Sequence, residues 1–447
     1  MKNNKLIFRI KALISLILVL MVFFSLFLFR KTSAIPGIDV QTDTLKQSYI
    51  QDEYRKKALE GDIVDRNGVV LSTTSVAGES GVLTTPQAYS WLIGYNNPIY
   101  GTFGLKGSYE AQLYTYSKNN KGANITLTID DELQQYCYNL IKGSNGSIIV
   151  MKKDTAELLA LSSAREVEFN VNNINQESVD YWNSIDSFWL ANGYRDMQEP
   201  GSVFKVISAS AILEANKESE LVNDQAKCMI ENHEVVNYDV DFASYNRDIA
   251  LGDALGYSSN VYFATMGYRL GGEVLSQKAK DFLIGEDIKL DFTTLRSSFD
   301  VEDNKTQLVC DSAYGQGKTL ITPLHIAMIY QSIANGGEMM KPYMVKSIDL
   351  NHKNLYKGKS EVLATPLSKE VAATLDGYLQ YAASDFYYAN VDGLRSKTGT
   401  AEIAGNKVKC TYASYNEDYV VVVSRVDEEG SGIDLQDIAL EIYDYLK

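Results

Sequence analysis

A buried helix that carries a lysine constrains this chain more than any other stretch. Pro200-Gly201 predicts a turn, and the segment from Val203 to Leu213 that follows is apolar with few helix breakers. We therefore expect a buried helix that begins at Ser202. Lys205 lies three residues further on, and side chains at this spacing share one face of a helix.

Ser202 and Lys205 have the properties of a nucleophile and its base. A lysine on an apolar helix is partly desolvated, which disfavours its charged form and lowers its pKa. A neutral Lys205 can take the proton of the Ser202 hydroxyl. The same spacing is common in solvated pairs, but Ser202 is the only serine of this chain with a lysine three residues later. The pattern predicts a catalytic pair only if suitable partner residues are present elsewhere.

The N-terminal residues have the pattern of a membrane anchor. An uncharged apolar run from Ala12 to Phe29 would span roughly 27 Å as a helix, close to the ~30 Å hydrocarbon core of a bilayer. A cleaved signal peptide is the alternative, because Thr32-Ser33-Ala34 loosely resembles a cleavage site. More positive charge precedes the run than follows it. We therefore expect a cytoplasmic tail at 1–11, a single-pass anchor at 12–29 and an external chain beyond it.

Composition excludes two classes of site. The net charge of −15 argues against nucleic acid as a partner. The four cysteines and three histidines lack ligand spacing, so no metal site is predicted. The cysteines allow either a disulfide or buried free thiols, and we slightly favour the thiols. They are Cys137, Cys228, Cys310 and Cys410.

The remaining chain divides into two regions. Residues 30–122 are expected to form a linker and a small irregular pedestal, in which Asn67-Gly68 predicts a hairpin turn. Residues 123–447 are expected to form one α+β domain, because predicted strands lie at both of its ends and helices between them. Two further helices are expected, one capped by Asp130 and one from Ile433 to Leu446. The predicted strands comprise 125–129, 147–151, 158–162, 394–402, 407–414 and 419–426.

Two later segments supply candidate partners for Ser202. Ser258 and Asn260 lie two residues apart at the start of an apolar helix-like segment. They can offer a hydroxyl for proton relay and an amide to hold a carbonyl, although both are also ordinary capping residues. Lys397-Thr398-Gly399-Thr400 places positive charge, hydroxyls and a glycine on one strand. Such a strand edge suits a peptide with a terminal carboxylate, bound by strand addition.

Together, Ser202-x-x-Lys205, Ser258-x-Asn260 and Lys397-Thr398-Gly399 form, in this chain order, the signature of the penicillin-binding protein and β-lactamase superfamily. The chain resembles the class B, monofunctional penicillin-binding proteins from the anchor to the last helix. Other segments are similar to motifs of that family: Glu199-Pro200-Gly201-Ser202, Lys397 to Glu402, Gly61 to Gly68, Gly315-Gln316-Gly317 and Thr322-Pro323-Leu324.

The resemblance implies a fold and an activity. The fold is the penicillin-binding transpeptidase fold, an antiparallel five-stranded sheet flanked by helices, with a pedestal and one transmembrane helix. The activity is D,D-transpeptidation of peptidoglycan stem peptides that end in D-Ala-D-Ala, inhibited by β-lactams, with no cofactor. Ser202 would attack the penultimate D-Ala carbonyl, and an amine of a neighbouring stem would complete the cross-link.

The resemblance also assigns roles to residues. Lys205 would be the base for Ser202, Ser258 would relay the proton to the leaving amine, and Asn260 would hold the amide of the acyl chain. Lys397 would supply positive potential. Three residues of the same strand would bind the substrate: Thr398, Gly399 and Thr400, with the two hydroxyls on the terminal carboxylate. The N–H groups of Ser202 and Thr400 would form the oxyanion hole.

Three departures from the family pattern suggest a divergent member. Glu60 stands where the family usually has an arginine, His325 replaces a common glutamine, and Cys410 to Ser414 lacks the usual aromatic pattern. None of these residues belongs to the predicted chemistry.

Other functions remain open from the motifs alone. A β-lactamase or β-lactam sensor shares them but does not need an external region of this length before the nucleophile. A D,D-carboxypeptidase, or an inactive scaffold that activates a glycan polymerase, also fits. The region before Ser202 is too short for a glycosyltransferase domain. We therefore expect a separate membrane polymerase of the shape, elongation, division and sporulation family as partner.

Overall fold

The structure is a computed structural model that describes residues 55–447 except 116, 239–246, 302–304, 390 and 404. All described residues belong to one unit, Gln47–Lys447. The predicted tail and anchor lie outside the described residues. Within those that are described, no helix has the length and apolar character needed to cross a membrane.

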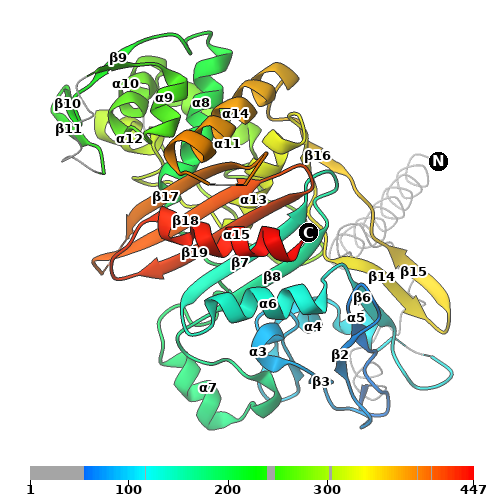
Figure 1. The fold of residues 1–447 in the computed structure, drawn as a ribbon. Helices are drawn as coiled ribbons and strands as arrows, with labels where there is room; N and C mark the ends of the chain where they lie inside the picture. The colour runs from blue at the N-terminus through cyan, green and yellow to red at the C-terminus, as the bar shows by residue number, and fades with distance from the viewer. Residues whose placement is uncertain (1–54, 116, 239–246, 302–304, 390, 404) are drawn as a thin grey trace, which may run out of the picture. The chain divides into compact units, whose positions relative to one another are not determined.

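A five-stranded antiparallel sheet joins the two ends of the domain and confirms the predicted sheet (Figure 1). The β-branched run from Val420 to Val423 is fully buried, and it pairs with Ile148 to Met151 from a segment about 270 residues earlier in the chain. The strands lie in the order β17 (Arg395–Ile403), β18 (Lys407–Tyr415), β19 (Tyr419–Asp427), β7 (Asn145–Lys152) and β8 (Leu158–Ala164).

Helices cover both faces of this sheet (Figure 1). On one face, α6 (Asp131–Ile141) and α15 (Gln436–Tyr445) bury their apolar stripes in a core with Val150 and Val421. Asp130 caps α6 as predicted, because its side chain accepts a hydrogen bond from the Leu133 N–H at 3.3 Å. On the other face, the almost wholly buried α13 (Pro323–Ala334) contacts the middle strands.

A mostly helical region adjoins β17 (Figure 1). The residues of the candidate site come from β17 and from this region. Its helices comprise α8 (Lys205–Glu214), α9 (Leu251–Gly256), α10 (Asn260–Leu270), α11 (Gly272–Asp281), α12 (Thr306–Ala313) and α14 (Lys369–Tyr381). Two short ribbons accompany them, β9 (Val222–Asp224) with β12 (Arg247–Ile249), and β10 (Lys227–Ile230) with β11 (His233–Val236).

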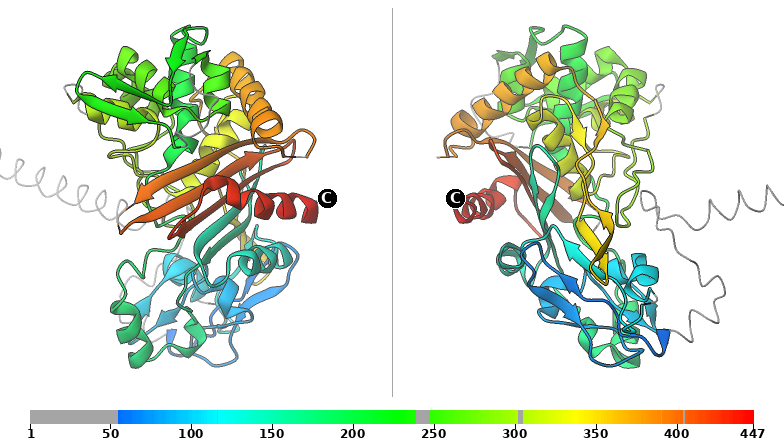
Figure 2. Two further views of the ribbon diagram at one scale, coloured as in Figure 1. Left: turned by 60° about the vertical axis from the view of Figure 1, so that its left-hand side comes forward. Right: turned by 90° about the vertical axis from the view of Figure 1, so that its right-hand side faces the viewer.

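A second sheet, which we call the pedestal sheet, joins strands of the expected pedestal region to strands from later in the chain. β6 was predicted as the first strand of the domain 123–447. In this sheet it pairs with β1 and with β14, and the sequence analysis did not predict β14. Figure 2 shows the yellow strands β14 and β15 beside the blue and cyan ones. The order is β15 (Lys353–Lys357), β14 (Val345–Leu350), β6 (Asn124–Leu127), β1 (Ile63–Val64), β2 (Val70–Thr73) and β3 (Val82–Leu83).

Short elements complete the fold. The predicted turn at Gly68 connects β1 and β2, with a left-handed φ of 90° that suits glycine. The remaining α-helices and strands comprise α3 (Pro86–Tyr89), β4 (Asn96–Asn97), β5 (Gly101–Thr102), α4 (Gly104–Ser108), α5 (Glu110–Leu113), α7 (Gln176–Asn183), β13 (Met339–Met340) and β16 (Val362–Ala364).

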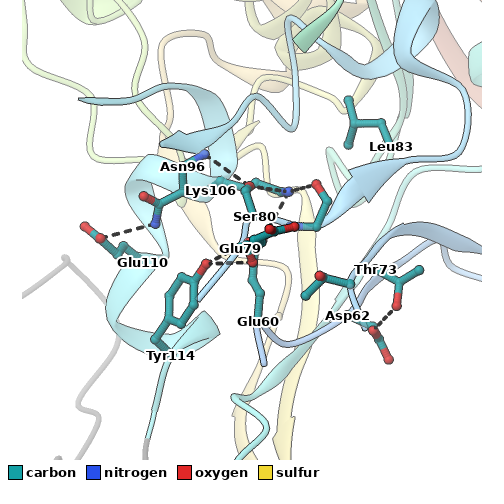
Figure 3. A network of polar contacts seen from close by, with 12 residues as sticks. Glu60, Asp62, Thr73, Glu79, Ser80, Leu83, Asn96, Lys106, Glu110 and Tyr114 are labelled. Atoms are coloured by element: carbon teal, nitrogen blue, oxygen red, sulfur yellow. Dashed lines mark hydrogen bonds and ion pairs between the residues drawn. The ribbon is translucent and has the colours of Figure 1, made fainter. Parts of the chain in front are cut away.

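The divergent Glu60 is the centre of a buried ion pair in the pedestal (Figure 3). Its Oε1 lies 3.2 Å from Nζ of Lys106, and both side chains are almost fully buried. Oε2 of Glu60 accepts hydrogen bonds from the Gly81 N–H at 2.9 Å and from the Tyr114 hydroxyl at 3.1 Å. Lys106 also donates to Ser80 Oγ at 3.0 Å. The pair therefore holds α4, α5 and the turn before β3 together.

All four cysteines are free thiols in the structure, in agreement with the alternative that we favoured. Three are buried and Cys228 is partly buried. Burial raises the pKa of the Cys410 thiol to about 12, so it packs as a neutral apolar group.

Candidate active site

Ser202 lies in a 3₁₀ turn, Gly201–Phe204, and the α-helix begins at Lys205 rather than at Ser202 as predicted. The difference strengthens the predicted geometry, because residues i and i+3 eclipse in a 3₁₀ turn. Nζ of Lys205 accordingly lies 2.8 Å from Oγ of Ser202. The structure therefore brings the predicted nucleophile and base into direct contact.

Glycines allow the turn of Ser202 to touch β17. Gly201 has a φ of 58°, and a Cβ there would lie 2.7 Å from the Thr400 carbonyl oxygen. A Cβ at Gly399 would lie 2.8 Å from the Pro200 carbonyl oxygen. Only glycine permits such backbone approach. The predicted oxyanion hole of Ser202 and Thr400 N–H groups depends on this contact.

Gly315 supports the turn from behind. Its carbonyl accepts a hydrogen bond from the Gly201 N–H at 2.9 Å, and a Cβ on Gly315 would lie 2.1 Å from the Gly201 carbonyl oxygen. The φ of Gly315 is 87°, which disfavours any other residue. The Gly315-Gln316-Gly317 segment thus contributes to the shape of the nucleophile turn.

Lys205 is fully buried among neutral oxygen atoms. Besides Ser202, its Nζ contacts the Ser258 carbonyl oxygen at 2.5 Å, Asn260 Oδ1 at 2.8 Å and Ser258 Oγ at 3.3 Å. Burial lowers the pKa of Lys205 well below its usual value. The charge of Lys397 lowers this pKa further, and Asp224 partly opposes the shift. Lys205 is thereby favoured as a neutral amine.

These contacts match the needs of a neutral amine. Such an amine has two N–H donors and one lone pair. In the neutral form, the two donors can serve the Ser258 carbonyl and Asn260 Oδ1, which leaves the lone pair for the Ser202 hydroxyl. Lys205 is therefore arranged to accept the proton of Ser202 as that hydroxyl attacks.

Ser258 connects the two active-site lysines. Its Oγ lies 2.8 Å from Nζ of Lys397 and 3.3 Å from Nζ of Lys205. Ser258 lies between α9 and α10 with a φ of 58°, a strained conformation for a residue with a side chain. This geometry suits the predicted relay of a proton from Lys205 towards the cleft.

Asn260, the first residue of α10, forms hydrogen bonds through both polar atoms of its side-chain amide. Its Oδ1 faces Lys205, and its Nδ2 donates to the Val236 carbonyl at 2.9 Å. The structure thus shows Asn260 orienting the base. Its predicted contact with the acyl chain remains a prediction.

A buried carboxylate that the sequence analysis missed supports this loop. Asp224 accepts hydrogen bonds from the Ser259 hydroxyl, from Asn237 Nδ2 at 3.0 Å and from the Ala226 N–H at 2.8 Å. Asn237 in turn accepts from the Val261 N–H at 3.1 Å. No motif or spacing marks Asp224 or Asn237, because their partners come together only in the fold.

The site opens into a cleft of about 730 Å³ between β17 and the helical region. Thr398 and Thr400 line it as predicted, and Thr400 Oγ1 also accepts a hydrogen bond from the Gly432 N–H at 3.0 Å. Lys205 and Lys397 are fully buried behind the lining, while the hydroxyls of Ser202 and Ser258 border the cleft. In the described part of the chain, no group of residues is suited to hold a metal ion.

A serine hydroxyl in contact with a lysine whose pKa is lowered well below its usual value, at the edge of a glycine-bearing strand, is the arrangement of a serine acyl-transfer enzyme. The chain belongs to the penicillin binding protein transpeptidase domain family, whose model matches residues 146–443. This finding confirms the predicted family.

Related proteins share this assignment. The chain is 26% identical to penicillin-binding protein 3 of Bacillus subtilis over 70% of its own length, but it spans only 48% of that relative. It is 25% identical to the peptidoglycan D,D-transpeptidase PbpA of Mycolicibacterium smegmatis over 81% of each chain. These names support the prediction of a class B protein.

Solved structures show the same fold. The D,D-transpeptidase domain from Eggerthella lenta superposes with a TM-score of 0.77 at 23% identity, over 87% of this chain and 98% of that one. The penicillin G acyl-enzyme complex of penicillin-binding protein A from M. tuberculosis gives 0.79 at 21% identity, over 88% and 100%. The penicillin-binding transpeptidase fold is therefore confirmed.

Proposed function

We propose that this chain is a peptidoglycan D,D-transpeptidase that cross-links stem peptides ending in D-Ala-D-Ala through an acyl-Ser202 intermediate. The observation that carries this proposal is the 2.8 Å contact between Ser202 Oγ and the fully buried Nζ of Lys205. The related PbpA proteins, named as peptidoglycan D,D-transpeptidases, support the choice of substrate.

Acylation forms one bond and breaks another at the same carbonyl. Ser202 Oγ bonds to the penultimate D-Ala carbon as its proton passes to Lys205. The bond from this carbon to the nitrogen of the terminal D-Ala then breaks. The leaving nitrogen receives a proton from Lys205 through Ser258. The Oγ of Ser258 lies 3.3 Å from Nζ of Lys205. The released product is D-Ala.

Cross-linking reverses these proton movements. An amine of a second stem attacks the acyl-Ser202 carbonyl and gives up a proton towards Lys205. Ser202 Oγ leaves and takes the proton back. Because acceptor and leaving group use the same relay, one constellation serves both half-reactions.

Electrostatic features around Ser202 stabilise the charge that develops. The N–H groups of Ser202 and Thr400 bind the oxyanion. In comparable enzymes, the loss of one such donor lowers kcat by about 10²–10³-fold. Lys397 provides positive potential, and the Thr398 and Thr400 hydroxyls bind the carboxylate of the terminal D-Ala. β-Lactams would acylate Ser202 by the same route; the solved structures of penicillin-binding protein A from M. tuberculosis include acyl-enzyme complexes with ceftriaxone and penicillin G.

Product analysis tests this function against its alternatives. Purified chain is given a stem pentapeptide with and without an amine acceptor, and the Ser202→Ala variant is the control. We expect D-Ala release and a cross-linked product that both require Ser202. Release of D-Ala to water alone would indicate a carboxypeptidase. Ser202→Ala that fully restores growth of a deletion strain would indicate a scaffold, and rapid loss of bound penicillin would indicate a β-lactamase.

Location and partner extend the proposal. The uncharged run 12–29 with its basic flanks supports a single-pass anchor in a bacterial cell membrane, with the catalytic domain outside. A reporter enzyme that works only outside the cytoplasm should be active when it is fused after residue 447.

We expect a membrane glycan polymerase of the shape, elongation, division and sporulation family as partner. Failure to co-purify with it or stimulate it would contradict this expectation.

A further inference from the structure

Tyr387 occupies a place in the active site that no sequence motif marks. Its hydroxyl oxygen lies 2.9 Å from Nζ of Lys397, and the residue lines the cleft together with Ser202 and Ser258. It comes ten residues before Lys397 in the chain, directly after a π-helical turn, Ala382–Phe386. Turns of this rare kind are frequent at functional sites.

Tyr387 completes the set of partners around Lys397. The ammonium group of a lysine has three N–H donors. Those of Lys397 meet Ser258 Oγ at 2.8 Å, Tyr387 Oη at 2.9 Å and the Thr398 carbonyl oxygen at 3.0 Å. The Thr398 carbonyl belongs to the same strand as Lys397. Tyr387 and Ser258 are therefore the two contacts that fix the ammonium group across the site.

The fold holds Tyr387 firmly in this position. Its N–H donates to the Ala382 carbonyl at 3.0 Å, and its own carbonyl accepts from Gln436 Nε2 at 3.1 Å. The preceding Phe386 packs edge-on against Tyr257 with ring centroids 4.6 Å apart. A Cβ on Gly256 would lie 2.3 Å from the Phe386 ring, so a glycine is needed there. The Tyr387 segment is thus tied to the residues just before Ser258.

We propose that Tyr387 is a positioning residue for acyl transfer. By accepting a hydrogen bond from Lys397, it holds the ammonium group against Ser258 Oγ and keeps this hydroxyl between Lys397 and Lys205. Without it, the ammonium group loses one of its two fixed partners, and Ser258 is less well placed to pass a proton. This role rests on the proposed acylation of Ser202.

The first test compares two neighbouring tyrosines. Tyr387→Phe keeps the ring and removes only the hydroxyl, whereas Tyr388→Phe removes the hydroxyl of a 75% exposed tyrosine. The full chain is mixed with a fluorescent penicillin, and the second-order rate constant of acylation is measured along with the thermal midpoint. Tyr387→Phe should acylate about tenfold more slowly, because a hydrogen bond to a charged group is lost, and should still unfold in a single transition above the assay temperature. Tyr388→Phe should match the wild type.

A double-variant cycle separates positioning from a general structural role. If Tyr387 acts through Lys397 and Ser258, Tyr387→Phe should cause no further loss in a Ser258→Ala background. The same fold-loss in both backgrounds would overturn the positioning role. So would wild-type acylation by Tyr387→Phe, and either result would leave the proposed function intact. A folded wild type that is never labelled would overturn both proposals.

Discussion

Two fully buried lysines show how the same side chain can support a fold in one region and chemistry in another. Lys106 in α4 and Lys205 in α8 are both 0% exposed, and burial lowers the pKa of each. Lys106 has the Glu60 carboxylate 3.2 Å away, which partly restores its pKa. In the described residues, the hydrogen-bond contacts of Lys205 Nζ are all to neutral oxygen atoms, nearby Lys397 lowers its pKa further, and Asp224 only partly opposes the shift.

The difference lies in the charge of the neighbours rather than in burial. A buried cation with a counter-charge holds elements together, whereas a buried amine without one tends to lose its proton. The free lone pair becomes useful for catalysis because Ser202 Oγ lies 2.8 Å away. The comparison predicts that substitutions at the two lysines change different properties of the protein.

The largest expected effect follows from Lys205→Met, which removes the base and keeps most of the side-chain volume. Acylation by a fluorescent penicillin should slow by about 10²–10⁴-fold. The fold should persist, because no buried charge loses its counter-ion. Lys106→Met is the matched control, since it should lower stability but leave the acylation rate of folded molecules near wild type. Equal acylation by Lys205→Met and wild type would show that Lys205 is not the base.

Glu60→Gln should have the next largest effect, on stability rather than on rate. It leaves Lys106 buried without its counter-charge, and breaking such a pair costs about 3–5 kcal/mol. Urea unfolding measures this loss. Glu110→Gln serves as control, because its ion pair with Arg55 is partly exposed and contributes less than about 1 kcal/mol. Adding Lys106→Met to Glu60→Gln should recover most of the stability, and a further loss would contradict the ion-pair account.

His325 is a third buried basic side chain, and it predicts how the stability of the fold depends on pH. Desolvation lowers its pKa from 6.5 to about 4. Its two ring nitrogens lie 2.9 Å from Ser297 Oγ and 2.8 Å from the Phe282 carbonyl oxygen, which suits a neutral ring. Unlike Lys205, it does not contact Ser202 or Ser258, which line the active-site cleft. It should therefore affect stability alone.

The sign of this effect follows from proton linkage. Between about pH 6.5 and 4 the unfolded chain binds a proton that folded His325 does not, so stability is complete above this window and falls within it. The loss at pH 4 should reach at most about 3 kcal/mol. His325→Gln should flatten the dependence of urea unfolding on pH in this window. An unchanged slope would show that His325 does not contribute.

Strand patterns made the central sheet predictable from the sequence. The expected strands 407–414 and 419–426 correspond to Lys407–Tyr415 and Tyr419–Asp427, because β-branched runs and polar turns mark them. The pedestal sheet was not predictable. Its strands β6 and β14 pair across about 220 residues, and neither carries a pattern that selects the other.

The active site was also only partly predictable from the sequence. The motifs identified Ser202, Lys205, Ser258 and Lys397 because their chemistry depends on residue type and fixed spacing. Asp224, Asn237, Tyr387 and Gln436 were missed, since each contributes through contacts that form only after distant segments meet. Tyr387 in particular depends on a π-helical turn, which has no sequence signature here.

The pH dependence of acylation tests the central claim most directly. The rate constant for penicillin acylation of the wild type is measured from pH 5 to pH 10, with Lys205→Met as the background. If Lys205 is neutral and acts as the base, the rate should reach its plateau well below pH 10.5, the usual pKa of a lysine. A rate that rises about tenfold per pH unit through pH 7 to 9 would show that Lys205 carries a proton as an ordinary lysine does, and would contradict the account.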